Sequence, residues 1–354
     1  MTNLYHQLLQ LLARCRDAVA AIQPRGGAFD HPSQKTRADY LRLGETLLHR
    51  ARYAEHGLRD VLTNTTSPRT FHKRMAALRY FLHVRQRELM ASVHQASDEQ
   101  LQSLQPELEQ HLQTLEALVA TQSAGFQGMR KKRQSKRKAL AGLPWGWREK
   151  LCQRSQAGSY GKAILAAAVS GCRPIELQMG IVIWRDYDET LQTDMINIFV
   201  NGAKVKGQHQ GQPWRIIHYV ATDDHPLIVA TNKLLDQQEE PILHVQIPNP
   251  GNFTVEVRRL GKCLWPAHRH SITAYCLRHQ WAADIKSTRS ADSVSRGLGH
   301  VSAKTRRNYG QAQQASKAGA LRPLEVTVER SIKPPSTKSH LSKARPSVPK
   351  PEIP

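Results

Sequence analysis

The stretch AILAAAVSGCRPIELQMG, residues 163–180, breaks an apolar helical run and restarts it beside an arginine. The small and apolar residues up to Val169 are typical of a buried helix, and Pro174 suits the first position of a following helix. Arg173 therefore falls in a turn between two helices. We expect its guanidinium to reach across a cleft rather than into solvent, with Glu176 three residues further on.

The residues after this turn alternate between strand-like and helical patterns. Three runs rich in β-branched and aromatic residues are separated by turn-forming or polar stretches and lie at 180–186, 194–200 and 213–220. Helical patterns return at 225–238, 252–264 and 271–285. The prediction is a mainly α domain with one small antiparallel β-sheet of three strands.

The N-terminal part, residues 1–125, shows helical periodicity throughout. Its clearest helix begins with Ser67 as a cap and Pro68 at the first position, and it carries an apolar stripe at Phe71, Met75, Leu78 and Leu82. Lys73 and Arg74 share this helix. It either faces DNA phosphates or presents a solvated surface with packed aliphatic stems.

A second helical segment is rich in acids and contains a leucine stripe. The stripe consists of Leu101, Leu104, Leu108, Leu112 and Leu115. Because the segment carries five acids and no Lys or Arg, it is not expected to touch phosphate. Packing into a core is the first interpretation, and contact with a neighbouring protomer is the alternative.

The chain is predicted to divide into four parts. A helical, core-binding-like domain over 1–125 precedes a basic linker at 126–147, a second domain at 148–318 and a Pro-, Lys- and Ser-rich tail at 319–354 that is expected to be disordered. The linker carries a basic run that begins with Arg130, Lys131, Lys132 and Arg133. This run either lies along a DNA backbone or only keeps the linker solvated.

The charge balance narrows the choice of partner. A net charge of +22, from 51 Lys and Arg against 29 Asp and Glu, favours a polyanion, and double-stranded DNA is the expected partner. No run approaches the ~20 apolar residues that cross a bilayer, and the N-terminus lacks the pattern of a secretion signal. We expect a cytoplasmic, nucleoid-associated protein with no membrane partner.

The cysteines and histidines do not predict a metal site. Five cysteines, odd in number and never arranged as CxxC, favour reduced thiols. His268 and His270 lie close in sequence, but no second ligand pair stands at a usual zinc spacing. We expect no metal and no other cofactor.

Several polar residues of the second domain could converge on one phosphate. Lys204 and Lys206 lie in the turn between the second and third strands, Arg278 lies in an apolar helix, and His300 and Tyr309 follow a Gly-rich turn. Two arginines can stabilise a pentacoordinate phosphorus without a metal. A cationic setting favours the tyrosine anion as a nucleophile, and a lysine can protonate the leaving oxygen.

On these residues the second half resembles the catalytic domain of the tyrosine recombinases, the phage-integrase family. The resemblance lies in GCRPIEL, in YCLRHQWA with GLGHVS, and in TRRNYG, in this order. It implies the following site: Arg173, Lys204, Tyr275, Arg278, His300 and the nucleophile Tyr309, supported by Glu176 and Lys206. Tyr275 departs from the family, which usually has a histidine there. A phenol is a poor base, so this departure bears on activity; His270 and His279 are alternatives, although both are more simply structural histidines.

The resemblance implies a site-specific DNA integrase or recombinase of a mobile element, acting through a 3′-phosphotyrosyl link without metal or ATP. It also implies that the two domains clamp duplex DNA between them, that four protomers form a homotetramer around two duplexes by exchanging a C-terminal segment after Tyr309, and that accessory DNA-bending proteins are further partners. Two alternatives remain. One is strand relaxation by a type IB topoisomerase-like enzyme, and the other is a DNA-binding protein of the same fold with reduced or lost catalysis.

Overall fold

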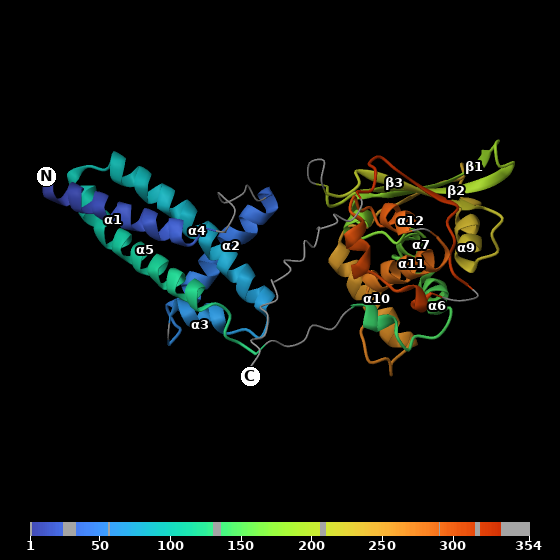
Figure 1. Ribbon diagram of the computed structural model, residues 1–354, viewed down its shortest axis with the longest axis horizontal. Coiled ribbons are helices and arrows are strands. Elements are labelled where there is room, and N and C mark those ends of the chain that lie inside the picture. Colours follow the sequence, from blue (N-terminus) through green and yellow to red (C-terminus); the bar gives the residue numbers. More distant parts are fainter. Residues whose placement is uncertain are drawn as a thin grey trace, which may run out of the picture. The chain divides into compact units, whose positions relative to one another are not determined.

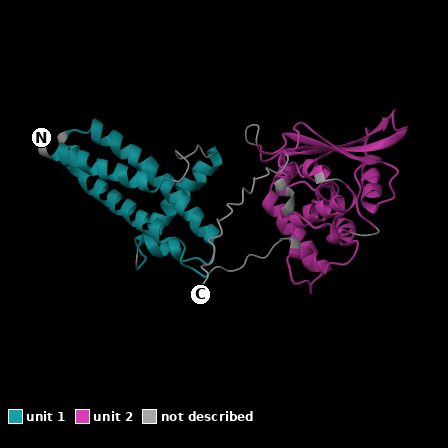
Figure 2. Cartoon of the chain, viewed as in Figure 1, with its two compact units in different colours: residues 1–133 teal, residues 134–354 magenta. Residues whose placement is uncertain are grey.

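The chain forms two compact units, residues 1–133 and 134–354, coloured teal and magenta in Figure 2. The computed structural model describes residues 2–23, 33–55, 57–129, 136–205, 210–289, 291–315 and 319–333. The boundary between the units lies inside the stretch 126–147. None of the helices within these described ranges is long and apolar enough to span a membrane.

Unit 1 is helical, as predicted. It contains α1 (Thr2–Ala21), α2 (Gln34–Ala51), α3 (Leu58–Thr63), α4 (Pro68–Gln95) and α5 (Asp98–Ala124) (Figure 1). Helix α4 begins where the sequence indicates, because the Ser67 hydroxyl accepts a hydrogen bond from the Thr70 backbone N–H and Pro68 takes the first helical position. The predicted stripe of this helix is buried.

The leucine stripe of α5 packs into the core of unit 1. Leu101, Leu108, Leu112 and Leu115 are all buried, and Leu104 packs beside them partly buried. The core interpretation is therefore confirmed. The alternative, in which these leucines contact a neighbouring protomer, is wrong because α1 and α4 already cover the stripe.

Unit 2 is built around a helix that is buried over most of its length. The helices are α6 (Trp147–Ser155), α7 (Gly161–Ser170), α8 (Pro174–Met179), α9 (Pro226–Leu235), α10 (Pro250–Leu264), α11 (Ala274–Thr288) and α12 (Ala291–Gly297), with 3₁₀ turns η1 (Lys136–Leu140), η2 (Ala303–Asn308) and η3 (Ala312–Gln314). Every residue of α11 from Cys276 to Ile285 is buried. A helix that is covered on all sides forms the centre of a domain, and α11 lies inside unit 2 in Figure 1.

The sheet of unit 2 has five strands in the order β4-β1-β2-β3-β5, and all neighbours are antiparallel. The three predicted strands are β1 (Ile181–Asp188), β2 (Thr193–Asn201) and β3 (Trp214–Val220). The prediction of only three strands is wrong, because β4 (Ile242–Val245) and β5 (Glu325–Val328) extend the sheet on its two sides. Four residues give too few alternations to identify a strand from sequence.

Strand β5 also corrects the predicted tail. Residues 319–333 were assigned to a disordered segment, but Val326 is buried and β5 pairs with β3. The Lys333 backbone N–H also donates to the Val301 carbonyl at 2.7 Å. Residues 334–354, the remainder of the predicted tail, lie outside the described residues.

The end of the predicted linker belongs to unit 2. Ala139, Leu140 and Trp147 are buried in its core, and the Trp147 indole N–H donates to the Gln280 side-chain oxygen at 3.0 Å. The aromatic and apolar residues that follow the basic run explain this, because burying them in the core lowers the free energy relative to leaving them in water. Unit 2 thus begins before the predicted start at residue 148.

Candidate active site

Arg173 lies in the predicted turn between α7 and α8. Gly171 ends α7 with φ +58°, and a side chain there would lie 2.7 Å from the Trp281 ring. Arg173 precedes Pro174 as the N-cap of α8, and it is 7% exposed. Its backbone N–H donates to Glu176 Oε2 at 2.7 Å, and its Nη1 donates to Glu176 Oε1. Glu176 therefore fixes both the backbone and the guanidinium of Arg173.

Arg278 approaches the same point from the buried helix α11. Its Nη1 donates to the Gly171 carbonyl at 2.7 Å and its Nη2 to the Leu298 carbonyl at 2.6 Å. Arg173 Nη2 also reaches the Leu298 carbonyl, at 3.4 Å. Burial, together with the charge of Arg173, lowers the pKa of Arg278 to about 10, so that both guanidiniums remain charged at neutral pH.

A third arginine, which the sequence analysis missed, completes this cluster. Arg215 on β3 is fully buried, and its Nη2 donates to Glu176 Oε2 at 2.9 Å. Arg278 Nη1 lies 3.9 Å from the same oxygen. One carboxylate thus faces three guanidiniums. Although burial opposes its ionisation, Arg215, Arg173 and Arg278 hold the pKa of Glu176 well below its ordinary value.

A sequence signal for Arg215 existed. On β3 the buried positions alternate, and Arg215 shares the buried face with Ile217 and Tyr219. A charged residue on the core face of a strand requires a partner. Period-two alternation groups Arg215 with Ile217 and Tyr219. Only the structure shows that this face, and not that of Trp214 and Ile216, is the buried one.

Tyr309 lies against this cationic cluster. Its ring centroid is 4.8 Å from Arg278 Cζ and 5.3 Å from the ring centroids of both His279 and His300. Burial opposes ionisation of the phenol, but Arg278 and Arg173 outweigh it and lower the pKa of Tyr309 below its ordinary value. The phenol is therefore easier to ionise than a free tyrosine.

His300 supplies a further polar group. It is 6% exposed, and neither of its ring nitrogens has a hydrogen-bond partner among the described residues. Burial and the charges of Arg278, Arg173 and Arg215 lower its pKa to about 2. The ring is accordingly neutral at physiological pH. A neutral imidazole has one N–H donor, so one of these two nitrogens could donate to a bound anion beside the guanidiniums.

A cavity of about 230 Å³ brings most of the predicted residues together. Arg173, His300 and Tyr309 line it, and Lys204, which is exposed, lines it from the loop that follows β2. Lys206 lies outside the described residues. Arg173, Lys204, His300 and Tyr309 thus meet at one hollow, whereas Arg278 is fully buried behind Tyr309 and does not line it.

Tyr275 occupies the first turn of α11, half-buried. Burial lowers the pKa of Arg173, but Glu176, Tyr309 and, more weakly, Tyr275 raise it. The net shift of the Arg173 pKa is upward. Tyr275 therefore lies within electrostatic reach of the site. Of the two alternative histidines, His279 contacts Tyr309, whereas His270 lies edge-to-face with His268 and does not line the cavity.

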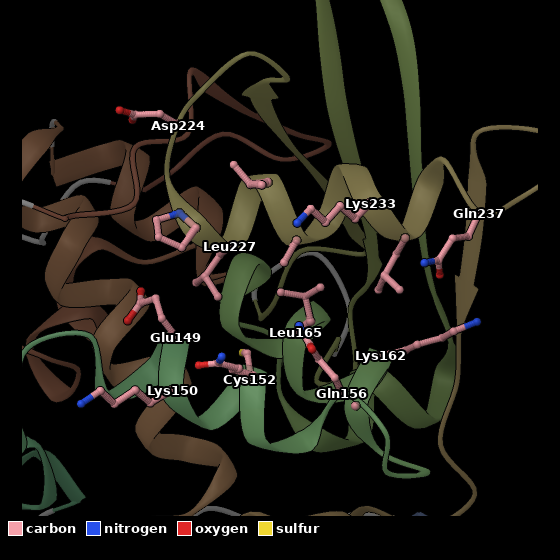
Figure 3. Close-up of a pocket in the computed structure, with 16 residues that line it drawn as sticks. Glu149, Lys150, Cys152, Gln156, Lys162, Leu165, Asp224, Leu227, Lys233 and Gln237 are labelled. Atoms are coloured by element: carbon pink, nitrogen blue, oxygen red, sulfur yellow. The ribbon is translucent and has the colours of Figure 1, made fainter.

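A larger hollow of unit 2 lies away from this cavity. A cavity of about 960 Å³ lies among α6, α7 and α9, with Lys150, Lys162 and Lys233 around it (Figure 3). Glu149 and Asp224 line it as well, so its charges are mixed. It contains none of the predicted site residues, and it is therefore distinct from the candidate active site.

The two predicted DNA contacts on α4 differ in the structure. Lys73 is exposed. Arg74 is half-buried, and its Nη1 donates to the Val61 carbonyl at 2.8 Å and to the Asn64 carbonyl at 3.1 Å. Arg74 thus joins α4 to the end of α3. The basic residues Arg130, Lys131, Lys132 and Arg133 lie outside the described residues.

Comparisons with known proteins give likenesses at the level of overall structure only. No family model matches the chain, and no curated protein matches its sequence. A crystal structure of XerA recombinase is 16% identical over 85% of this chain and 92% of that chain, with a TM-score of 0.32. A structure of XerH site-specific recombinase bound to difH substrate, in a pre-cleavage complex, is 12% identical over 79% of this chain and 95% of that chain, with a TM-score of 0.33. TM-scores of this size are too low to carry a functional assignment.

Proposed function

We propose that the protein is a site-specific DNA recombinase or integrase that cuts and rejoins DNA through a 3′-phosphotyrosyl intermediate. The observation that carries the proposal is the setting of Tyr309: its pKa is lowered by Arg278 and Arg173 at a cavity that Lys204 and His300 also line. A nucleophile, a proton donor and a cationic anion site are the three parts that metal-free phosphoryl transfer requires.

The first step transfers a phosphoryl group from DNA to the enzyme. The Tyr309 oxygen, after losing its proton to solvent, attacks a backbone phosphorus and forms the Tyr309–phosphate bond. The bond from phosphorus to the 5′ oxygen breaks, and Lys204 gives that oxygen its proton. The 5′ hydroxyl of a second duplex then attacks the phosphotyrosine in the reverse sense. Each step exchanges one phosphoester for another, so that no ATP is needed.

Arg173, Arg278 and His300 would hold the non-bridging oxygens of the phosphate. Arg278 retains a buried Nε without a hydrogen-bond partner among the described residues, so it has donor capacity beyond its two carbonyl contacts. Neutral His300 can donate one hydrogen bond. The negative charge of a bound phosphodiester would raise the His300 pKa and strengthen that contact.

The proposal includes the wider assignments of the sequence analysis. Double-stranded DNA is the substrate, the active assembly is a homotetramer on DNA, and accessory DNA-bending proteins assist it. Lys73 is the remaining described phosphate contact of the predicted set in unit 1. Integration or excision of a mobile element in the cytoplasm is the expected biological setting.

The test is covalent capture of DNA. A nicked duplex that contains sequence flanking the protein's own gene is incubated with wild type and with Tyr309→Phe in the presence of a chelator. Adducts are then scored on a denaturing gel. We expect an adduct with wild type and none with Tyr309→Phe. If Tyr309→Phe formed the same adduct, another nucleophile would be responsible.

Tyr275 favours a second candidate function, a DNA-binding protein of this fold with weakened catalysis. A phenol at this position is a poorer proton shuttle than an imidazole. The variant Tyr275→His is the matched comparison. A large gain of adduct in this variant, with little or none in wild type that still binds the duplex, would support the second function. Comparable yields in both proteins would support the first.

A further inference from the structure

Tyr309 and Gly310, here called the Tyr309 segment, pack against one face of α11. The residues that meet the segment are His279, Ala283 and Lys286, whose spacing of four and then three places them on one side of a helix. The His279 ring lies beside the Tyr309 ring. The contact at Gly310 is closer still, since a side chain there would lie 2.1 Å from the His279 carbonyl and 3.1 Å from Ala283 Cβ. The chain after Tyr309 thus packs directly on the backbone of α11.

Lys286 closes this contact at its far end. Its Nζ donates to the Tyr309 carbonyl at 3.1 Å and also to the Gly310 carbonyl. These carbonyls directly follow η2, which ends at Asn308. Carbonyls at the end of a helical turn lack a donor within that turn, and a cation placed there satisfies them. The lysine is half-buried, so water screens these bonds less than on an open surface.

We infer that Lys286 is a positioning residue that clamps the main chain at Tyr309 and Gly310, so that the phenol stays over Arg278. The inference rests on the proposed function, in which Tyr309 is the nucleophile. The same helix carries Arg278, and the clamp therefore fixes the nucleophile and the anion-binding guanidinium in one frame. Positioning of this kind affects the rate strongly, because small misplacements of a reacting atom are costly.

In this structure the nucleophile and the lysine that clamps it come from the same chain. Arg278 and Lys286 belong to the same helix, and both contact the Tyr309 of their own chain in this structure. Loss of the Lys286 amine would free the segment without removing any group that touches the phosphate. The DNA affinity should therefore survive while the cleavage rate falls.

The experiment compares Lys286→Met and Lys286→Arg with the control Lys162→Met. Methionine keeps the length of the side chain without its donor, and arginine keeps a cationic donor. Lys162 is an exposed lysine of α7 that lines the larger, separate cavity. Three quantities are measured for each protein: the single-turnover rate of adduct formation, the affinity for the same duplex, and hydrogen–deuterium exchange of peptides covering residues 303–312.

For Lys286→Met we expect an adduct rate lower by about tenfold or more, as loss of a charge-assisted hydrogen bond implies, with affinity within about twofold of wild type. Exchange should accelerate over 303–312 and stay unchanged in the strands of the sheet. Lys286→Arg should recover most of the rate, and Lys162→Met should behave as wild type. An unchanged rate and unchanged exchange in Lys286→Met would overturn the inference, as would acceleration spread evenly over unit 2.

The exchange measurement separates this inference from the proposed function. If wild type forms no adduct, the proposed chemistry fails, and the clamp is judged by exchange alone. Selective acceleration at 303–312 then supports the clamp, and its absence overturns it. If wild type forms the adduct and Lys286→Met forms it equally fast, the chemistry stands and the positioning role falls.

Discussion

At the residue scale the site depends on the ratio of charges around Glu176. Three guanidiniums share one buried carboxylate, which leaves a net charge of about +2 in a largely buried region at the edge of the cavity. Burial and this uncompensated charge together lower the pKa of His300, and the charge outweighs burial to lower the pKa of Tyr309. A bound phosphodiester would offset part of this charge. Without a bound anion the buried excess of positive charge is thus unfavourable, and a bound anion would stabilise it.

His300 yields a prediction for stability against pH. Its pKa is about 2 in the folded protein, against an ordinary value of 6.5 when unfolded. Between these values the unfolded chain binds a proton that the folded chain does not, so stability falls as the pH falls below 6.5. The contribution reaches about 2 kcal/mol between pH 6.5 and pH 5.

The measurement is denaturant unfolding of wild type and His300→Gln at pH 7 and pH 5. We expect wild type to lose more stability than the variant over this interval, and the difference between the two losses isolates His300 from the other buried histidines. Equal losses in both proteins would show that His300 keeps an ordinary pKa in the folded state.

At the element scale α11 and the loops around it determine the geometry. Helix α11 supplies Arg278, touches Tyr309 through His279, and holds the chain beyond it through Lys286. The C-terminal segment adds a second connection. The Gln212 side chain accepts from the Arg330 backbone N–H at 2.9 Å and donates to the Arg330 carbonyl at 2.7 Å. Residues near the C-terminal end of the described chain thus anchor Gln212, just before β3.

Strand β5 provides the element-scale prediction. Val326 is 3% exposed and packs into the core of unit 2, while its neighbour Glu325 is exposed. Val326→Asp buries a carboxylate without a partner and should lower the free energy of unfolding by about 3 kcal/mol or more. Glu325→Ala, the matched control in the same strand, should change it by less than about 0.5 kcal/mol. Equal effects of the two variants would mean that residues 325–328 do not belong to the fold.

At the scale of the whole molecule the excess positive charge is unevenly distributed. Helix α5 carries five acids and no Lys or Arg, while α4 and the linker are rich in basic residues. A polyanion would therefore meet selected faces of the molecule. Within α4, an exposed basic residue can contact a phosphate, whereas one whose side chain already bonds to the protein cannot do so as easily.

Lys73 and Arg74 test this distinction as a pair. Lys73 is exposed, so Lys73→Gln should weaken DNA binding, reduce the salt dependence by about one ion, and leave the unfolding free energy unchanged. Arg74 is bonded to two carbonyls of the α3 segment, so Arg74→Gln should lower stability by about 1–3 kcal/mol. Affinity titrations at several salt concentrations, together with thermal melting, measure both effects. The reverse pattern would place Arg74 at the DNA and Lys73 in the fold.

The sequence by itself determined the helical character of unit 1, the three long strands and the turn that holds Arg173. Each depends on local signals: the cap at Ser67, Pro174 at a helix start, and runs rich in β-branched and aromatic residues from Ile181 onward. The order of the polar residues also suggested a common site at Arg173, Arg278, His300 and Tyr309. Local pattern is sufficient where neighbouring residues decide the conformation.

Only the tertiary structure decided the partners of these residues. Arg215 meets Glu176 across 39 positions of sequence, and Lys286 meets the Tyr309 carbonyl across 23. The fold also pairs β5 with β3 and brings the Arg74 side chain to the Val61 and Asn64 carbonyls. Such contacts depend on which surfaces the fold brings together, and short strands and single charges carry no local signal of their distant partners. Burial then set the charge states, because the same side chains in water would keep their ordinary pKa values.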